Sequence, residues 1–217
     1  MPIVAMGGTP DDALLDYVLG LARGSRLLYV PTAGMENPLW AVDWYDRLRD
    51  RATMRHLHFD PWPPDNLREV VFDHDIVLVP GGNTANMLAI WRVHGFDVIL
   101  REAWERGLVL AGWSAGAICW FEVGVTDSFG PQLERMECLG FLPGSACPHY
   151  DGEELRRPRY AELLREGLPR GIAVDDDAAV RFDGTELTEV VTSRAGATAY
   201  RVSVDGEGAL EARRLLP

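Results

Sequence analysis

A single serine lies between two glycines at positions 112–116, whose sequence is Gly-Trp-Ser-Ala-Gly. The G-x-S-x-G spacing is typical of a nucleophile elbow, a tight strand-to-helix turn that holds a serine in strained geometry with its hydroxyl exposed. The amide of Ala115 would then begin the following helix and point at the oxyanion that forms when Ser114 attacks a carbonyl carbon. The alternative is a glycine-rich turn in which the serine only caps a helix.

A second glycine-rich segment, Pro-Gly-Gly-Asn-Thr at 80–84, follows an apolar run and precedes a helical pattern. Glycine lets the backbone approach a ligand closely, so the amide of Gly82, or that of Gly81, would supply a second donor to an oxyanion. We expect Asn83 to contact substrate, and Asn83 or Thr84 also suits the N-cap of the next helix. The segment lacks the Lys-Ser/Thr ending of a phosphate-binding loop.

A serine nucleophile needs a general base, and the chain has five histidines. His149 follows a stretch of small residues and lies downstream of the serine, so we predict that it is the base. His56 and His58 share one strand face but lack a third ligand at metal-binding spacing, so we expect half-exposed strand residues there. His74 and His94 lie beside polar helix ends and are expected to be solvated.

Three consecutive carboxylates occupy positions 175–177 in an otherwise apolar segment. An unpaired buried charge is costly, so at least one of them should have a partner. A carboxylate that orients the histidine is the third member of a serine-hydrolase triad. The alternative is a polar bend in which all three carboxylates are solvated. Asp127, downstream of the elbow, competes for the orienting role and is expected to form a wall of the substrate pocket.

The elements that position these residues alternate between short apolar runs and longer helical patterns. Buried parallel strands are predicted at 2–6, 26–30, 75–79 and 107–111, and one more strand is predicted at 54–59. Amphipathic helices are predicted at 11–23, 38–51, 84–94 and 96–106. This alternation predicts an α/β fold with a doubly wound, mostly parallel sheet covered by helices on both faces, in three layers. In such a fold, ligands bind at the carboxyl ends of the strands, where the candidate loops emerge.

Beyond residue 180 the pattern changes to period two. A hairpin is predicted at 180–187 with its turn at Asp183-Gly184, and further alternating segments span 197–204 and 210–215. We expect these C-terminal antiparallel hairpin strands to add an edge to the parallel sheet.

The composition limits the classes of protein to consider. A chain of 217 residues is expected to form one core, so residues 1–217 are taken as a single domain. A formal net charge of −12 repels phosphate and anionic lipid, so neither nucleic acid nor a membrane is expected as a partner. Without a signal peptide or a bilayer-length apolar run, a cytoplasmic location is expected, with reduced cysteines and no cofactor or metal. A homodimer is left open.

Five segments come in the order found in peptidase E, and the whole chain resembles that family. They are Val-Pro-Gly-Gly-Asn-Thr at 79–84, Gly-Trp-Ser-Ala-Gly-Ala at 112–117, Thr126-Asp127, Pro148-His149 and the carboxylates at 175–177. The resemblance implies a class I glutamine amidotransferase-like fold and a cytoplasmic serine peptidase, with Ser114 as nucleophile and His149 as base. The family's usual third residue is a glutamate after the last parallel strand, and the matching position here is Asp176.

The resemblance also implies small peptide substrates, because peptidase E members cleave dipeptides with an N-terminal aspartate. The segment after His149, at 150–157, is tighter than the family's loop, which carries an arginine for the substrate carboxylate. Arg156 is the candidate for that role, with Arg159 nearby, and weak or absent activity on Asp-X dipeptides is expected. Three alternatives remain: a binding protein without turnover on the same fold, a cyanophycinase-like hydrolase, and an amidotransferase-like enzyme, which would carry cysteine in place of Ser114.

Overall fold

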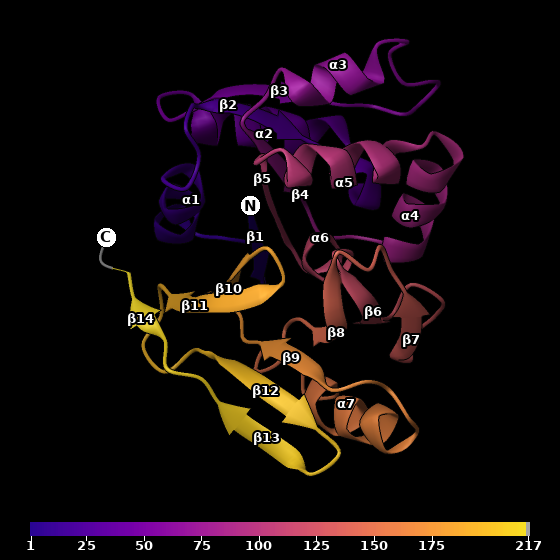
Figure 1. Ribbon diagram of the computed structural model, residues 1–217, viewed down its shortest axis with the longest axis vertical. Coiled ribbons are helices and arrows are strands. Elements are labelled where there is room, and N and C mark those ends of the chain that lie inside the picture. Colours follow the sequence, from indigo (N-terminus) through magenta and orange to yellow (C-terminus); the bar gives the residue numbers. More distant parts are fainter. Residues whose placement is uncertain (216–217) are drawn as a thin grey trace.

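The computed structural model describes residues 1–215. Within that range the chain forms two β-sheets flanked by helices, with the larger sheet in the upper part of the view and the smaller sheet below it (Figure 1). Both sheets mix parallel and antiparallel strands.

The described part of the chain places five parallel strands at the centre of the larger sheet, in the order β3-β2-β4-β5-β1. They are β1 (Pro2–Met6), β2 (Arg26–Tyr29), β3 (Thr53–His56), β4 (Ile76–Val79) and β5 (Val109–Trp113). All five predicted strands are confirmed, although β5 begins and ends two residues later than expected. Since Tyr29, Val79 and Trp113 end neighbouring strands, the loops that follow them meet at one edge of the sheet.

Helices cover both faces of this sheet. They are α1 (Asp12–Leu19), α2 (Pro38–Leu48), α3 (Leu67–Phe72), α4 (Thr84–Val93) and α5 (Phe96–Glu105), with a single 3₁₀ turn, η1 (Pro31–Gly34), after β2. Val4 and Met6 pack with α1 and α2, whereas the alternate residues Ile3 and Ala5 pack with α3, α4 and α5. The three predicted layers are confirmed. The short helix α3 was not predicted, and α1 and α2 end earlier than expected.

Two C-terminal strands extend the larger sheet beyond β1 as expected. β10 (Ala178–Asp183) pairs antiparallel with β1, and β11 (Glu186–Thr192) pairs with β10 through the predicted turn. The short β14 (Arg213–Arg214) completes that edge. The expectation that the remaining C-terminal strands join this sheet is wrong. β12 (Ala199–Ser203) and β13 (Gly206–Ala209) belong to the smaller sheet, because β12 pairs with the open edge of β9 (Gly171–Val174).

The smaller sheet was not predicted, and it carries the loop that bears His149. Its remaining strands are β6 (Phe121–Thr126), β7 (Glu134–Glu137) and β8 (Leu142–Cys147). β6, β8 and β9 run parallel, so the loop after β8 leaves the same end of the sheet as the loop after β9. Helix α7 (Arg156–Arg165) covers one face through Tyr160, Leu163 and Leu164.

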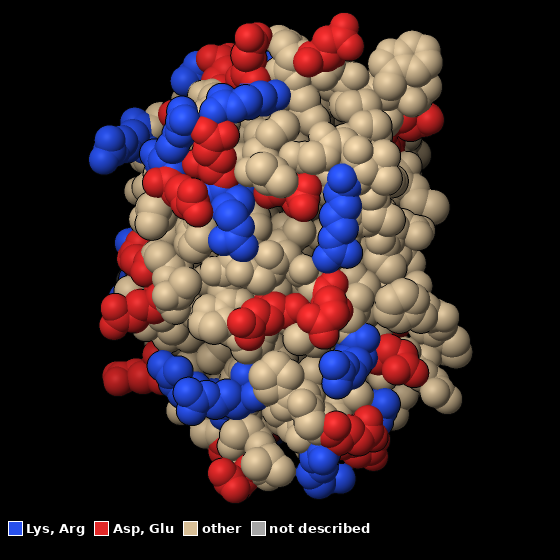
Figure 2. All heavy atoms as spheres, turned by 45° about the vertical axis from the view of Figure 1, so that its right-hand side comes forward, with Lys and Arg blue, Asp and Glu red and all other residues tan. Residues whose placement is uncertain are grey.

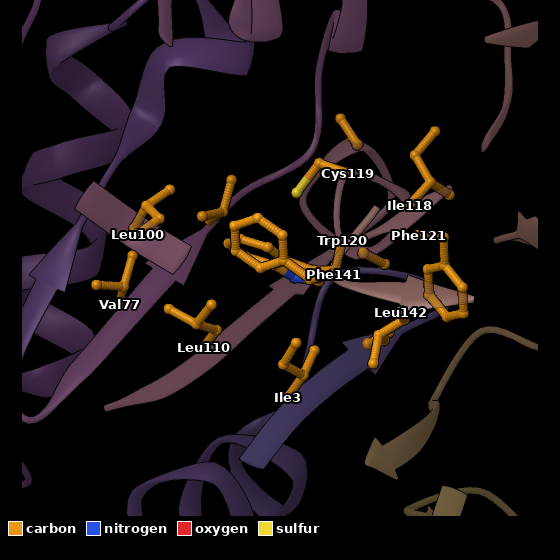
Figure 3. Packing of buried hydrophobic residues seen from close by; sticks show 14 of the residues in the cluster. Ile3, Val77, Leu100, Leu110, Ile118, Cys119, Trp120, Phe121, Phe141 and Leu142 are labelled. Carbon is orange, nitrogen blue, oxygen red and sulfur yellow. The ribbon is translucent and has the colours of Figure 1, made fainter. Parts of the chain in front are cut away.

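The two sheets share a hydrophobic core. Figure 3 shows Trp120, Phe121 and Phe141, from the chain around β6 and β8, gathered beside Ile3 and Leu110 of the larger sheet. The rings of Trp120 and Phe141 lie 5.8 Å apart. Because full burial of an aromatic side chain contributes about 1.5–3 kcal/mol, this cluster holds the smaller sheet in a defined position against β1 and β5.

The surface in Figure 2 intersperses basic and acidic side chains with neutral ones. Some of the chain's charges are paired, as where Arg68 and Arg106 both contact Glu102. None of the helices in residues 1–215 combines the length and apolar character needed to cross a bilayer. The three cysteines are free thiols, as expected.

Candidate active site

Ser114 occupies a strained turn between β5 and the short helix α6 (Ala115–Ile118). Its φ of 54° and ψ of −114° are rare for a residue with a side chain. The flanking glycines explain how the turn closes. A Cβ on Gly112 or on Gly116 would collide with the carbonyl oxygen of Val79 in the neighbouring strand β4. The strand-to-helix context that the elbow motif requires is therefore present.

Two backbone segments border the Ser114 side chain. Ala115 is the first residue of α6, so its amide has no acceptor within the helix. On the other side, a Cβ on Gly81 would lie 3.1 Å from the Ser114 Cβ and 3.5 Å from its Oγ. Gly82 has a φ of 136° and packs its α-carbon against the backbone of Ala33. The Gly-Gly turn thus brings its backbone against the serine through Gly81, while Gly82 forms the bend.

Asn83 is engaged within the protein. Its side-chain oxygen accepts a hydrogen bond from the Asn86 amide at 2.9 Å, which makes it the N-cap of α4 and confirms the capping interpretation. Its side-chain nitrogen donates to the Ser128 carbonyl at 3.0 Å. The Ser128 hydroxyl in turn accepts from the Thr84 amide at 2.9 Å. Asn83 therefore joins the Gly-Gly turn to the loop after β6.

His149 and Asp176 are joined by a hydrogen bond of 2.7 Å between Nδ1 and Oδ1. His149 has a φ of 51°, a second strained position in a residue with a side chain. Glycines approach the Asp176 carboxylate from two directions, since a Cβ on Gly8 or on Gly152 would collide with it. With Nδ1 directed at the carboxylate, Nε2 is the ring nitrogen left for a reacting group.

The backbone around Asp176 is held by an arginine from the loop after β11. Arg194 donates to the Asp176 carbonyl at 3.0 Å and to the Asp177 carboxylate at 2.8 Å, and it also pairs with Asp151. The other Asp151 oxygen accepts from the Asp176 amide at 2.8 Å. Asp176 is thus held by its own amide and carbonyl groups, which leaves its carboxylate free for His149.

The other carboxylates have different environments. Asp175 is 2% exposed, and burial raises the pKa of its carboxyl group. Its Oδ2 accepts from the Thr198 amide at 3.0 Å. Asp177 pairs with Arg194, as described above. Asp127 is exposed and forms no side-chain hydrogen bond within residues 1–215, so the structure does not bring it to His149. The solvated bend is thus wrong for Asp175.

Ser114 and His149 line the same cavity, which has a volume of about 360 Å³. Its walls come from the ends of β1, β2, β4 and β5, from α2 and from the loop after β8, through Thr9, Tyr29, Trp40, Asp43, Trp44, Gly81, Trp113, Ser114 and His149. The α2 residues were not among the expected site residues. Their sequence signal was the unusual pair of tryptophans flanking an aspartate at 40–44.

Arg156 lies elsewhere. It is 3% exposed, and its guanidinium donates to the Glu153 carboxylate at 2.7 Å and to the Val125 carbonyl at 3.1 Å. Arg159 donates to the Leu133 carbonyl at 3.0 Å and pairs with glutamates of α7. Neither arginine lines the cavity beside Ser114. Helix α7 turns the Arg156 side chain into the interior, where it binds protein groups.

The remaining histidines do not line this cavity. His74 was expected to be solvated, which is wrong: it is 7% exposed, bonds to the Val70 carbonyl at 2.6 Å, and has a pKa lowered by burial. His56 contacts the Tyr45 hydroxyl at 2.8 Å, and His58 lies 3.3 Å from Glu36. No cluster of three or more metal-ligating side chains occurs in the part of the chain that the structure describes.

Two solved structures have the same fold. A peptidase from an acI-B1 Actinobacterium superposes with a TM-score of 0.71 at 22% identity, over 97% of this chain and 94% of the other. A putative peptidase E from Listeria monocytogenes EGD-e superposes with a TM-score of 0.64 at 17% identity, over 93% of this chain and 98% of the other. These likenesses establish a peptidase E-like fold.

Sequence relatives extend the comparison. An uncharacterized peptidase of Bacillus subtilis (strain 168), YgaJ, is 45% identical over 210 residues, which cover 92% of this chain and 91% of the relative. Peptidase E of Shewanella amazonensis is 29% identical over 84% of this chain and 83% of its own length. The model of peptidase family S51 matches residues 5–190. This chain therefore belongs to peptidase family S51 and is a serine-type peptidase.

Proposed function

We propose that Ser114, His149 and Asp176 form the catalytic triad of a peptidase that acts on short peptides. One observation carries the proposal: His149 hydrogen-bonds to Asp176 at 2.7 Å while it lines the same cavity as the strained Ser114. A histidine oriented by a carboxylate beside an exposed serine is the arrangement that activates a hydroxyl for attack on a carbonyl carbon.

In the proposed reaction, the Ser114 Oγ attacks the scissile carbonyl carbon and its proton passes to His149 Nε2. The carbonyl π electrons move to oxygen, and the amide of Ala115 with that of Gly82 or Gly81 donates hydrogen bonds to the resulting oxyanion. Collapse of the intermediate breaks the C–N bond as His149 returns its proton to the leaving amine. Water then hydrolyses the acyl-enzyme with the same histidine as base. Asp176 keeps Nδ1 protonated and stabilises the imidazolium.

Aspartate in place of the family's usual glutamate fits the local backbone. The Asp176 side chain is one methylene shorter, so the chain that carries it has to come closer to the histidine. Gly8 and Gly152 allow this approach, because any Cβ at either position would collide with the Asp176 carboxylate. The glycines therefore provide the close backbone approach that the short aspartate side chain requires.

The size of the cavity favours short substrates. A volume of about 360 Å³ is at the small end for a ligand site and holds roughly one residue with its flanking backbone. We expect long peptides and folded proteins such as casein to be poor substrates. Efficient release of peptides from casein would contradict this expectation.

An N-terminal aspartate is expected to be a poor fit. The cavity lining contains no arginine within the described residues, and its one carboxylate, Asp43, would repel an acidic side chain. We expect kcat/KM for Asp-Leu to be no higher than for Leu-Leu. A preference for Asp-Leu of about a hundredfold, which corresponds to about 2.7 kcal/mol, would show that an aspartate site exists elsewhere on the surface.

The experiment that tests the triad is a Ser114→Ala substitution combined with fluorophosphonate labelling. The variant should keep its melting temperature and lose both covalent labelling and hydrolysis, with kcat falling about 10⁴–10⁶-fold. Ser203→Ala, a change in the distant strand β12, is the matched control and should keep both. If the wild-type protein took up no label and cleaved no dipeptide, a binding protein on this fold would replace the peptidase proposal.

A further inference from the structure

Four aromatic side chains line the cavity beside Ser114 and His149. The ring of Tyr29, at the end of β2, stacks on Trp44 of α2 with centroids 5.6 Å apart. Trp44 lies 5.1 Å from the ring of Trp113, the residue before Ser114. Trp40 packs over Gly34, where any Cβ would collide with its ring, and it completes the wall. A ligand side chain beside Ser114 would therefore meet the faces and edges of several aromatic rings.

This wall contains a carboxylate that no protein cation neutralises. Asp43 lines the cavity, is exposed, and forms no hydrogen bond or ion pair within residues 1–215. The arginines of the same region are paired elsewhere: Arg47 and Arg51 bind Asp12, and Arg49 binds Asp46. A free carboxylate next to electron-rich rings favours a cationic ligand, by charge and by cation–π attraction.

The same wall also contains a buried hydroxyl without a partner in residues 1–215. Tyr29 lines the cavity and is 0% exposed, and its hydroxyl has no hydrogen-bond partner within the described residues. A buried hydroxyl without a partner is costly, so such groups usually bind protein or a ligand. Burial also raises the pKa of Tyr29, which keeps the hydroxyl neutral. A neutral phenol can accept a hydrogen bond from an ammonium or guanidinium group.

We propose that this cavity binds the side chain of a lysine or arginine that flanks the scissile bond, with Asp43 as its counter-charge. The proposal rests on the proposed function and names its substrate class. The aliphatic stem of a basic side chain would pack on Trp44 and Trp113, while its charged end would reach the exposed Asp43 carboxylate. An apolar side chain would leave the Asp43 carboxylate unpaired, and an acidic one would be repelled by it.

Hydrolysis of dipeptides in matched pairs tests this proposal. Norleucine has the stem of lysine without its charge, so the ratio of kcat/KM for Lys-Leu over Nle-Leu, and for Leu-Lys over Leu-Nle, isolates the cation at each position. The wild-type ratio should be at least about tenfold at one of the two positions, which is about 1.4 kcal/mol of discrimination. Asp43→Asn should reduce that ratio to about threefold or less.

Asp46→Asn is the matched control, because Asp46 lies on the same helix and pairs with Arg49 outside the cavity lining. It should leave the ratio unchanged. A wild-type ratio near one at both positions, or a ratio unchanged in Asp43→Asn, would overturn the proposal. If Asp43→Asn lowered kcat/KM for the lysine and norleucine peptides equally, the carboxylate would bind the substrate's α-ammonium group, which also overturns it.

A binding measurement separates this inference from the triad. In the Ser114→Ala variant, L-lysinamide should bind at least about tenfold more tightly than L-norleucinamide by calorimetry, and Asp43→Asn should remove the difference. Both probes carry an α-ammonium group, so only the side-chain charge differs. Equal affinities would refute the basic-side-chain pocket even if hydrolysis and labelling of Ser114 were as proposed. Selective lysinamide binding without any hydrolysis would instead leave the pocket standing and remove the peptidase mechanism.

Discussion

The two sides of the cavity differ in whether their polar groups have hydrogen-bond partners. On the His149 side, Asp176 is bonded through its amide, its carbonyl and its carboxylate, and Arg194 ties the neighbouring carboxylates together. On the aromatic side, the Tyr29 hydroxyl and the Asp43 carboxylate have no partner within residues 1–215. The polar groups around Asp176 are therefore paired before any substrate binds, whereas the aromatic side has polar groups that are still unpaired in the described part of the chain.

The largest effect on kcat is expected at Asp176, which hydrogen-bonds to His149. Asp176→Asn should lower kcat by roughly 10³–10⁴-fold, because an amide at this position favours the wrong histidine tautomer. Asp127→Asn, a change at the exposed candidate that does not bond to His149, should alter kcat less than about threefold. The reverse ranking in steady-state kinetics on one dipeptide would transfer the orienting role to Asp127.

A smaller effect on kcat is expected at Arg194, which contacts the Asp176 backbone and not His149. Arg194→Gln should lower kcat by about 10- to 100-fold, because the Asp176 backbone loses the group that holds it and small misplacements of catalytic groups are costly. As a positioning residue, Arg194 should also change the pH profile of kcat, since a displaced carboxylate no longer stabilises the imidazolium. The control is Arg201→Gln, an exposed position on β12. A loss of stability with an unchanged pH profile would indicate a purely structural role.

Arg156 should contribute to stability and not to specificity. Arg156→Met leaves the Val125 carbonyl without its donor in a buried site, so the free energy of unfolding should fall by about 1–3 kcal/mol. KM for dipeptides should stay within about twofold of the wild-type value, measured well below the melting temperature. A rise in KM specific to acidic substrates, at unchanged stability, would restore the substrate contact expected from the sequence.

The smallest effect is a pH dependence of stability at Asp175, whose pKa in the folded state is raised by burial. A carboxyl group with a raised folded pKa binds its proton more tightly in the native state than in the unfolded state. Its contribution to stability is therefore present at low pH and is lost as the pH rises through the folded pKa. Asp175→Asn removes that loss, so the melting temperature of the variant relative to wild type should be higher at pH 7 than at pH 4. A difference independent of pH would contradict the raised pKa.

Local patterns in the sequence were sufficient for much of the larger sheet. Its five parallel strands, four of its helices and the hairpin at Asp183-Gly184 follow from periodicity and turn residues. The smaller sheet escaped this kind of reasoning. Its strand β8 reads Leu-Pro-Gly-Ser-Ala-Cys, in which proline and glycine disfavour a strand. Pairing with β6 and β9 imposes the strand there, and pairing partners are not visible in a local window.

In the candidate site, too, some residues could be recognised from local sequence and others could not. Ser114 and its glycines were recognisable because the elbow is a local motif, in which five consecutive residues set the backbone strain. His149 and the carboxylate segment were recognised by order along the chain, but the sequence left open which carboxylate meets the histidine. That choice depends on hydrogen bonds of the Asp176 backbone, whose carbonyl accepts from Arg194 and whose amide donates to Asp151. Both partners lie far from Asp176 in the sequence, so no periodic pattern reveals them.

What the sequence by itself determined is the fold class, the elbow and the short set of residues able to serve a serine peptidase, because these depend on local spacing and residue chemistry. Tertiary structure alone decided the direction of the side chains. It turned Arg156 into the interior and brought Asp43 and Tyr29 to the cavity beside Ser114. The physical reason is that burial and partner choice depend on the rotation of each helix and the packing of distant strands, which are properties of the whole folded chain.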